Sequence, residues 1–173
     1  MKRRDLLGAA LLLPLEGLAQ TCGVITLRQT EGPFFTPNSP KRISLVEANS
    51  NAPRLVLTGT VLSAQCKPVP NALLDFWHSD EEGAYDNRGF RYRGHQHADA
   101  HGRYRLETIV PAEYPGRTRH IHVKVQAPGK RILTTQLYFP GDPGNRRDGL
   151  YRAELEMKKA ASGGAGFDFV VDA

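Results

Sequence analysis

The sequence predicts an all-β fold, an antiparallel β-sandwich with long loops and at most one short helix near the C-terminus. Apolar and polar residues alternate over several short runs, as they do on a half-buried strand. The chain also has 17 glycines and 12 prolines, many of them between those runs, where turns are expected. Its 173 residues are enough for one domain with its own core, but not comfortably for two.

Six strands are expected along the chain. The first is expected near residues 55–61, where Leu55, Leu57 and Val61 alternate with Val56, Thr58 and Thr60. The others are expected at residues 72–77, 104–109, 120–126, 132–139 and 167–171. Short strands separated by Gly/Pro turns favour a sandwich. The one helical candidate is the segment 149–161, which we expect to cover one end of a sheet.

The N-terminal residues 1–19 are interpreted as an export signal. A Lys-Arg-Arg patch at residues 2–4 precedes an apolar run over residues 6–15, and a small residue, Ala19, closes the segment. This is the order of regions in a signal peptide. The run is too short to span a bilayer, which needs about 20 apolar residues. The paired arginines also resemble a twin-arginine signal. We therefore expect an exported protein, periplasmic or secreted, and a buried N-terminal helix is the alternative.

Residues 20–53 are rich in Pro, Asn, Ser and Thr, and we expect an extended arm there before a sandwich domain over 54–173. Cys22 and Cys66 can form one disulfide in an oxidising compartment, and two unpaired thiols are the alternative. The residues before Cys22, Gln-Thr, are too polar for a lipoprotein signal, so no membrane anchor is expected.

The charge pattern argues against a nucleic-acid partner. The chain has 23 Lys and Arg against 18 Asp and Glu, a formal net charge of +5 at pH 7. These basic residues are dispersed and form no block interleaved with aromatic side chains, so no nucleic acid is expected to bind.

A His-Ile-His motif lies inside one of the expected strands. Residues i and i+2 of a strand point to the same face, so His120 and His122 can meet one metal ion. The alternate residues Ile121, Val123 and Val125 would then face the core. Two surface histidines on a strand are the alternative.

Two tyrosines lie in loops that flank these strands. Tyr85 is in the glycine-containing segment 82–87, and Tyr114 is in the segment 111–116, just before the His-Ile-His strand. A loop tyrosine usually serves packing or lies on the surface. However, tyrosinate is a known ligand of ferric haem iron. Two phenolates with two imidazoles suit Fe(III) better than Zn(II), which prefers Cys and His in tetrahedral sites.

The remaining histidines give weaker signals. His95 and His97 form a second pair at i and i+2, with His101 close behind, but their Arg- and Gly-rich surroundings indicate a loop. We interpret them as solvated residues or the rim of a pocket, with a second metal site as the alternative. His78 is interpreted as structural or pocket-lining, and Trp77 as a core residue.

Several motifs follow one another in a fixed order along the chain. They are the segments 30–34, 68–72, 75–77, 99–104, 108–111, 114–117, 120–122, 135–139 and 141–143. Together they resemble the intradiol ring-cleavage dioxygenases, which include catechol and protocatechuate dioxygenases, over most of the mature chain. The segments 68–72 and 99–104 also resemble prealbumin-like modules, so the expected sandwich is prealbumin-like.

The resemblance implies a non-haem Fe(III) centre. Tyr85 looks like the equatorial tyrosinate of the family and Tyr114 like its axial one, while His120 and His122 look like its two histidine ligands. The implied function is an exported dioxygenase that inserts both atoms of O2 into a catechol-type ring and gives a muconate-type diacid. Its partners would be a small catechol and O2. Members of the family often associate, which is compatible with a homo-oligomer.

Three residues are implied as catalytic by the same resemblance. Arg117 and Gln136 match the active-site arginine and glutamine of the family, and Tyr114 can act as a base when a substrate displaces it. Two alternatives remain. One is a non-catalytic prealbumin-like binding module, which would need neither Tyr114 nor the histidine pair. The other is a zinc hydrolase that uses His120, His122 and a third histidine.

Overall fold

The structure is a computed structural model that describes residues 23–160 and 163–173. The predicted signal peptide, residues 1–19, lies outside the described residues, as does Cys22. In the part of the chain that is described, no helix is both long and apolar enough to cross a membrane. Cys66 is disulfide-bonded.

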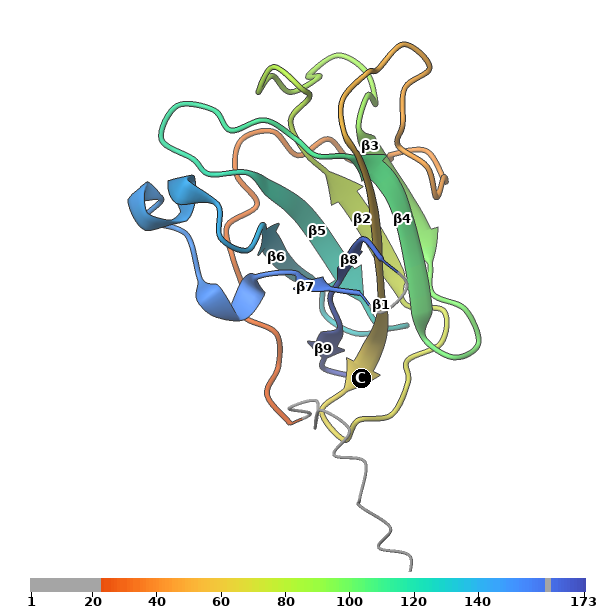
Figure 1. Cartoon of the computed structure of the whole chain (residues 1–173). Helices are drawn as coiled ribbons and strands as arrows, with labels where there is room; N and C mark the ends of the chain where they lie inside the picture. Colours follow the sequence, from red (N-terminus) through yellow and green to blue (C-terminus); the bar gives the residue numbers. More distant parts are fainter. Residues whose placement is uncertain (1–22, 161–162) are drawn as a thin grey trace, which may run out of the picture.

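The first of two sheets is built around strand β1 (Arg54–Ser63) (Figure 1). It pairs antiparallel with β4 (Arg103–Ile109) and parallel with β8 (Ala165–Gly166) and β9 (Phe169–Val171). The short β7 (Lys158–Lys159) pairs antiparallel with β8. This sheet is therefore mixed, whereas the sequence led us to expect antiparallel pairing throughout. Parallel neighbours need a long connection, and the chain that follows the second sheet provides one.

The second sheet has the order β3-β2-β5-β6 and is antiparallel throughout. Its strands are β3 (Arg93–His97), β2 (Leu73–Trp77), β5 (His120–Gln126) and β6 (Leu133–Tyr138). The prediction of a loop around His95 was wrong, because residues 93–97 form β3. This strand lacks an apolar alternation, because its core-facing positions are Gly94 and Gln96, the partners of Phe76 and Leu74.

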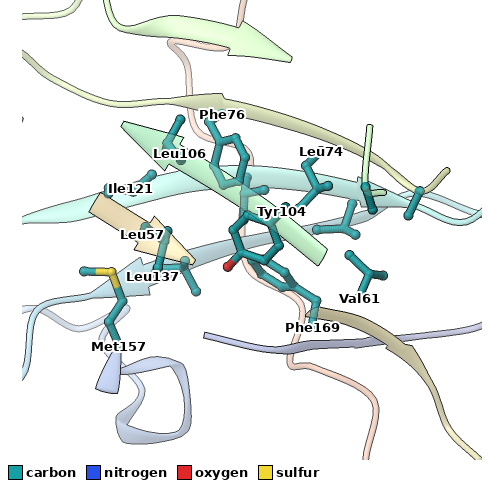
Figure 2. Close-up of a cluster of buried hydrophobic side chains, with 14 of the residues drawn as sticks. Leu57, Val61, Leu74, Phe76, Tyr104, Leu106, Ile121, Leu137, Met157 and Phe169 are labelled. Atoms are coloured by element: carbon teal, nitrogen blue, oxygen red, sulfur yellow. The ribbon is translucent and has the colours of Figure 1, made fainter. Parts of the chain in front are cut away.

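The two sheets pack face to face and enclose one hydrophobic core, part of which Figure 2 shows. Leu57 and Leu106 enter it from the first sheet, and Phe76, Ile121 and Leu137 enter from the second, all with no exposed surface. Burying a side chain of this size contributes about 1.5–3 kcal/mol. The expected orientation of β5 is confirmed, since Ile121, Val123 and Val125 all belong to the hydrophobic core.

The helix predicted over residues 149–161 is wrong for the part that the structure describes. The segment holds a short 3-10 turn, Ala153–Leu155, and then strand β7. A second 3-10 turn, Pro143–Arg147, precedes it. Leu155 and Met157 are both buried, and the Met157 N–H donates to the Tyr138 carbonyl at 2.9 Å. The chain is therefore held extended against β6 by packing, which overrides its weak helical preference.

Residues 23–53 contain no helix or strand, and residues 29–42 cross the outer face of the second sheet. The Gln29 N–H donates to Thr134 of the edge strand β6, and the Arg42 N–H donates to His95 of the opposite edge strand β3, both at 2.9 Å. Between these points Gly32 lies over His122, where an added Cβ would stand 3.5 Å from the ring carbon Cε1. The arm therefore roofs the outer face of this sheet.

Candidate metal centre

The outer face of the second sheet carries a row of side chains, one from each strand. Arg93, Trp77, His122 and Gln136 are paired neighbours across β3, β2, β5 and β6. His120 lies two residues before His122 on β5 and therefore on the same face. Both histidines are almost fully buried, so the alternative of two surface histidines is wrong.

The two imidazoles point their Nε2 atoms at a common place, 3.0 Å apart. Nδ1 of His120 lies 2.7 Å from the Thr118 carbonyl, which can only accept, so Nδ1 carries the proton and Nε2 has a free lone pair. The His122 ring is held instead by stacking on Trp77, with centroids 4.8 Å apart and planes 9° apart. Both rings are thus fixed from outside the centre.

Burial keeps both imidazoles neutral, which is the form that binds metals. It lowers the pKa of His120 to about 4. Burial also lowers the pKa of His122 well below its ordinary value, and the nearby His120 adds to the shift. Neither ring therefore has to lose a proton at neutral pH before it can act as a ligand.

Tyr85 and Tyr114 reach the histidine pair from two adjacent loops. Their ring centroids are 5.8 Å apart, and those of Tyr114 and His120 are 5.7 Å apart. Tyr85 and His122 are in edge contact at 6.2 Å. The loops touch at Gly83, whose φ is +84° and where a Cβ would lie 2.6 Å from the Glu113 carbonyl. Only glycine allows this approach, so the local sequence places the two tyrosines together.

Buried polar atoms without a hydrogen-bond partner gather at this site. Among the described residues there are four such side-chain atoms: Trp77 Nε1, Tyr85 Oη, Arg93 Nη2 and His122 Nδ1. A buried hydroxyl without a partner costs about 1–3 kcal/mol, so each such group calls for an explanation. Burial also raises the pKa of Tyr85 far above its ordinary value. A metal ion would give the Tyr85 oxygen a partner and would offset that rise.

The residues fit a ferric ion. A metal–imidazole bond is about 2.1 Å long, so two imidazoles at right angles around one ion hold their nitrogens about 3.0 Å apart. His120 and His122 have that separation. The two phenols supply hard oxygen donors of the kind that ferric iron takes. Two neutral nitrogens and two potential phenolates would together leave a ferric site with a single positive charge.

Arg117 and Gln136 lie beside the tyrosine ligand candidate. Arg117 donates to the Gln136 side-chain oxygen, and its Nη1 lies 3.5 Å from the Tyr114 hydroxyl. Its Nε donates to the Asp148 carboxylate at 2.9 Å, and that carboxylate also accepts from the Thr118 N–H at 3.0 Å. The structure thus brings Arg117, Gln136 and Tyr114 together, and Asp148 aims the arginine.

A cavity of about 340 Å³ adjoins these residues. Its walls include Glu113, Tyr114, Arg117, Thr118, Gly144 and Asp148. It lies on the side of the centre that carries the arginine and is large enough for a single aromatic ring.

The sequence analysis did not place four residues in the site, although the structure does. Trp77 is buried as expected, but it lies against a histidine ligand candidate and not in the hydrophobic core between the sheets. Arg93 was grouped with solvated loop residues, yet it is buried. Phe34 stacks on Tyr85 with centroids 4.5 Å apart, and the segment 30–34 was a signal that could have found it. Nothing in the sequence pattern marks Asp148.

The other histidines do not join the centre. His78 is buried and bonded on both ring nitrogens, to the Ser79 carbonyl and the Thr108 hydroxyl, each at 2.6 Å. The structural reading of His78 is therefore confirmed. Nδ1 of His95 lies 2.7 Å from the Ser39 carbonyl. In the described part of the chain, no group of three or more His, Cys, Asp and Glu residues is placed to hold a metal ion.

Acidification is expected to destabilise the metal-free protein between about pH 6.5 and pH 4. Burial lowers the pKa of His78 to about 4 from an ordinary 6.5. Within this window the unfolded state binds a proton that the folded state does not, so stability falls as the pH falls. For one such group the full difference is on the order of 3 kcal/mol.

Urea denaturation at several pH values across this window measures the effect. His120 and His122 contribute to the same slope, so His78→Gln should reduce the slope without removing it. His97→Gln, which removes an exposed histidine of β3, is the matched control for the loss of one imidazole. An undiminished slope in His78→Gln would contradict the assignment.

A sandwich that gathers two imidazoles and two phenols on one outer face has the donor set of a non-haem iron protein. The sequence model of a family described as Dioxygenase matches residues 30–161, which is most of the chain. The chain therefore belongs to the intradiol ring-cleavage dioxygenase family, as its motifs implied.

Relatives in the family are named for several catechols. A catechol 1,2-dioxygenase of Acinetobacter baylyi is 32% identical over 155 residues, which cover 73% of this chain and 50% of that protein. A hydroxyquinol 1,2-dioxygenase of Rhodococcus opacus is 31% identical over 137 residues, which cover 65% and 45%. The chain thus spans about half the length of these curated relatives.

Solved structures agree on the fold. The dioxygenase domain of a dioxygenase–carbohydrate-binding fusion from Streptomyces sp. SirexAA-E is 52% identical, with a TM-score of 0.82. That match covers 87% of this chain and 99% of the domain. A hydroxyquinol 1,2-dioxygenase from Pseudomonas putida is 25% identical with a TM-score of 0.78, over 90% of this chain and 68% of that one.

Proposed function

We propose that this chain is an exported Fe(III)-dependent intradiol dioxygenase that inserts both atoms of O2 into a catechol-type ring and gives a muconate-type diacid. The observation that carries the proposal is the convergence of His120, His122, Tyr85 and Tyr114 on one buried place. The names of the relatives, which include catechol, hydroxyquinol and chlorocatechol dioxygenases, support the substrate class. Export rests on residues 1–19 and is tested by cell fractionation.

The four converging residues would hold the metal. When bound, ferric iron would act as a Lewis acid that draws electron density from a coordinated catechol. The two histidines and the hydroxyl of Tyr85 are buried, whereas Tyr114 borders the cavity beside Arg117. Tyr114 is therefore the ligand candidate best placed to move aside for a substrate.

Tyr114 and Arg117 can manage the protons and charge of a catechol. A phenolate displaced from the metal can accept the proton of a catechol hydroxyl, which makes Tyr114 a general base. Arg117 lies next to that oxygen and can stabilise the negative charge of the deprotonated substrate. Preorganised groups of this kind are typically worth about 3–4 kcal/mol of barrier. The Gln136 side-chain oxygen accepts a hydrogen bond from Arg117 and thereby orients the guanidinium.

The N-terminal arm shields the centre from water. Phe34 stacks on Tyr85 and makes an edge contact with Tyr114, with centroids 6.2 Å apart. Phe35 packs on Trp77 with centroids 4.9 Å apart, and the Lys124 ammonium lies over its ring. Excluding water strengthens the electrostatic interactions inside the site.

Tyr114→Phe is expected to weaken the visible colour of the iron-loaded protein and to slow ring cleavage. The wild-type protein should be red, from phenolate-to-iron charge transfer, and should consume O2 with at least one member of a catechol panel. Losing one phenolate removes part of the absorption and removes the base. Absorption spectroscopy, an oxygen electrode and the absorbance of the diacid product measure these effects.

Tyr104→Phe is the matched control. It removes a hydroxyl of the core that donates to the Phe167 carbonyl at 2.7 Å, far from the metal ligands in the fold, and should leave the colour intact. A colourless protein with iron at full occupancy would sink the proposal. So would zinc at full occupancy without iron, which would favour the hydrolase alternative.

A further inference from the structure

Arg93 is a buried cation without a carboxylate partner. Its residue is 1% exposed, at the start of β3. Its Nε donates to the Asp86 carbonyl at 2.9 Å, its Nη1 donates to the Phe34 carbonyl, and its Nη2 has no hydrogen-bond partner. Both acceptors are neutral backbone groups, so no carboxylate is hydrogen-bonded to the guanidinium.

The nearest acidic groups have other partners. The Asp86 carboxylate accepts from three backbone N–H groups of its own loop, those of Arg88, Gly89 and Arg91. The Asp75 carboxyl accepts from the Ser39 hydroxyl at 2.7 Å, and burial raises its pKa. A buried charge without a counter-charge is strongly unfavourable. The position of Arg93 therefore calls for another source of negative charge.

Tyr85 is the group that Arg93 faces. The guanidinium carbon lies 5.9 Å from the centroid of the Tyr85 ring. Arg93 also donates to the carbonyls of Phe34, which stacks on that ring, and of Asp86, which follows Tyr85 in the chain. An aromatic ring attracts a cation, and a phenolate does so more strongly, because it carries a full negative charge.

We propose that Arg93 is a positioning residue that supplies the buried counter-charge for the Tyr85 phenolate at the metal centre. This inference rests on the proposed function, because Tyr85 carries a negative charge only as a metal ligand. Arg93 would stabilise the ionised form of Tyr85 and lower the energy of its lone-pair electrons. The charge-transfer transition from Tyr85 to the metal would then move to shorter wavelength.

The test uses the charge-transfer band of iron-loaded full-length protein. In a Tyr114→Phe background, Tyr85 is the one remaining phenolate of the centre, so the band belongs to it. Adding Arg93→Met should shift the band maximum to longer wavelength. It should also weaken iron binding about 10- to 100-fold, the usual effect of removing a group that supports a metal ligand. Chelator competition measures the second effect.

Two further variants separate the effect of the positive charge of Arg93 from the effect of its hydrogen bonds. Arg93→Lys keeps a positive charge with fewer hydrogen bonds, so its band should stay near that of the parent. Arg91→Met removes a half-exposed arginine of the same loop, which pairs with Asp80 and Glu81, and should leave the band unshifted. If Arg93→Met does not fold, Arg93→Gln removes the charge and keeps a donor.

The outcomes are distinct. If Arg93→Met or Arg93→Gln weakened iron binding without shifting the band, Arg93 would only hold the loops in place by hydrogen bonds. That result would overturn the inference. An equal shift in Arg93→Lys would also overturn it. A wild-type protein that shows the band but cleaves no member of the catechol panel would refute the proposed activity and leave the role of Arg93 standing. An iron-loaded parent without the band would overturn both.

Discussion

His122→Ala should abolish ferric iron binding and reduce kcat/KM by roughly a thousandfold or more, a loss of at least about 4 kcal/mol of transition-state stabilisation. The imidazole is one of two neutral nitrogen donors at the centre, and its Nε2 lies 3.0 Å from that of His120. Without it, the remaining nitrogen and the two phenols leave an open coordination position. Metal analysis after iron loading, together with oxygen uptake, measures the effect.

The metal-free His122→Ala protein should still fold, because the opposite face of β5 keeps Ile121 and Val123 in the core. His97→Ala, on β3 of the same sheet, removes an exposed imidazole and should retain both iron and activity. Retention of a full complement of iron by His122→Ala would remove this residue from the ligand set.

Asp148→Asn should destabilise the protein by about 3 kcal/mol, the lower end of what breaking a buried ion pair costs. The Asp148 side chain is 1% exposed and that of its partner Arg117 is 14% exposed. The same change should lower kcat/KM roughly 100-fold, because a small displacement of a positioned group is enough to cost that much. Urea denaturation and steady-state kinetics measure the two effects.

Asp99→Asn is the matched control for this change. It breaks an exposed ion pair with Arg103, also 2.9 Å long, and should cost less than about 1 kcal/mol. If Asp148→Asn lost stability but kept its kcat/KM, the orientation of the Arg117 guanidinium would not depend on this carboxylate. The pair would then be structural alone.

The histidine pair and the core behind it could be predicted because both follow from the period of a strand. The alternation of His120, Ile121 and His122 assigns one face to the metal and the other to the core, whatever else the chain does. The loop tyrosines could not be placed in this way. Nothing in the local pattern of Tyr85 or Tyr114 fixes a direction, so they were assigned from the resemblance to a family.

Strand β3 and the missing helix show where pattern reasoning stops. Arg93 and His95 lie on the outward face of a strand whose core-facing positions are Gly94 and Gln96, so the usual apolar alternation is absent. The segment around Leu155 is extended because its buried residues dock on β6, a contact between distant parts of the chain. In both places tertiary packing decides the outcome, and no local signal reports it.

The strictly alternating strand β5 ties catalysis to folding in a way that limits how the protein can change. Inserting or deleting one residue within it would exchange the occupants of its two faces. Ile121 and Val123 would then face the proposed metal centre, and His120 and His122 would be buried in the hydrophobic core. Neither the metal centre nor the core would survive, so insertions and deletions are expected to fall outside β5.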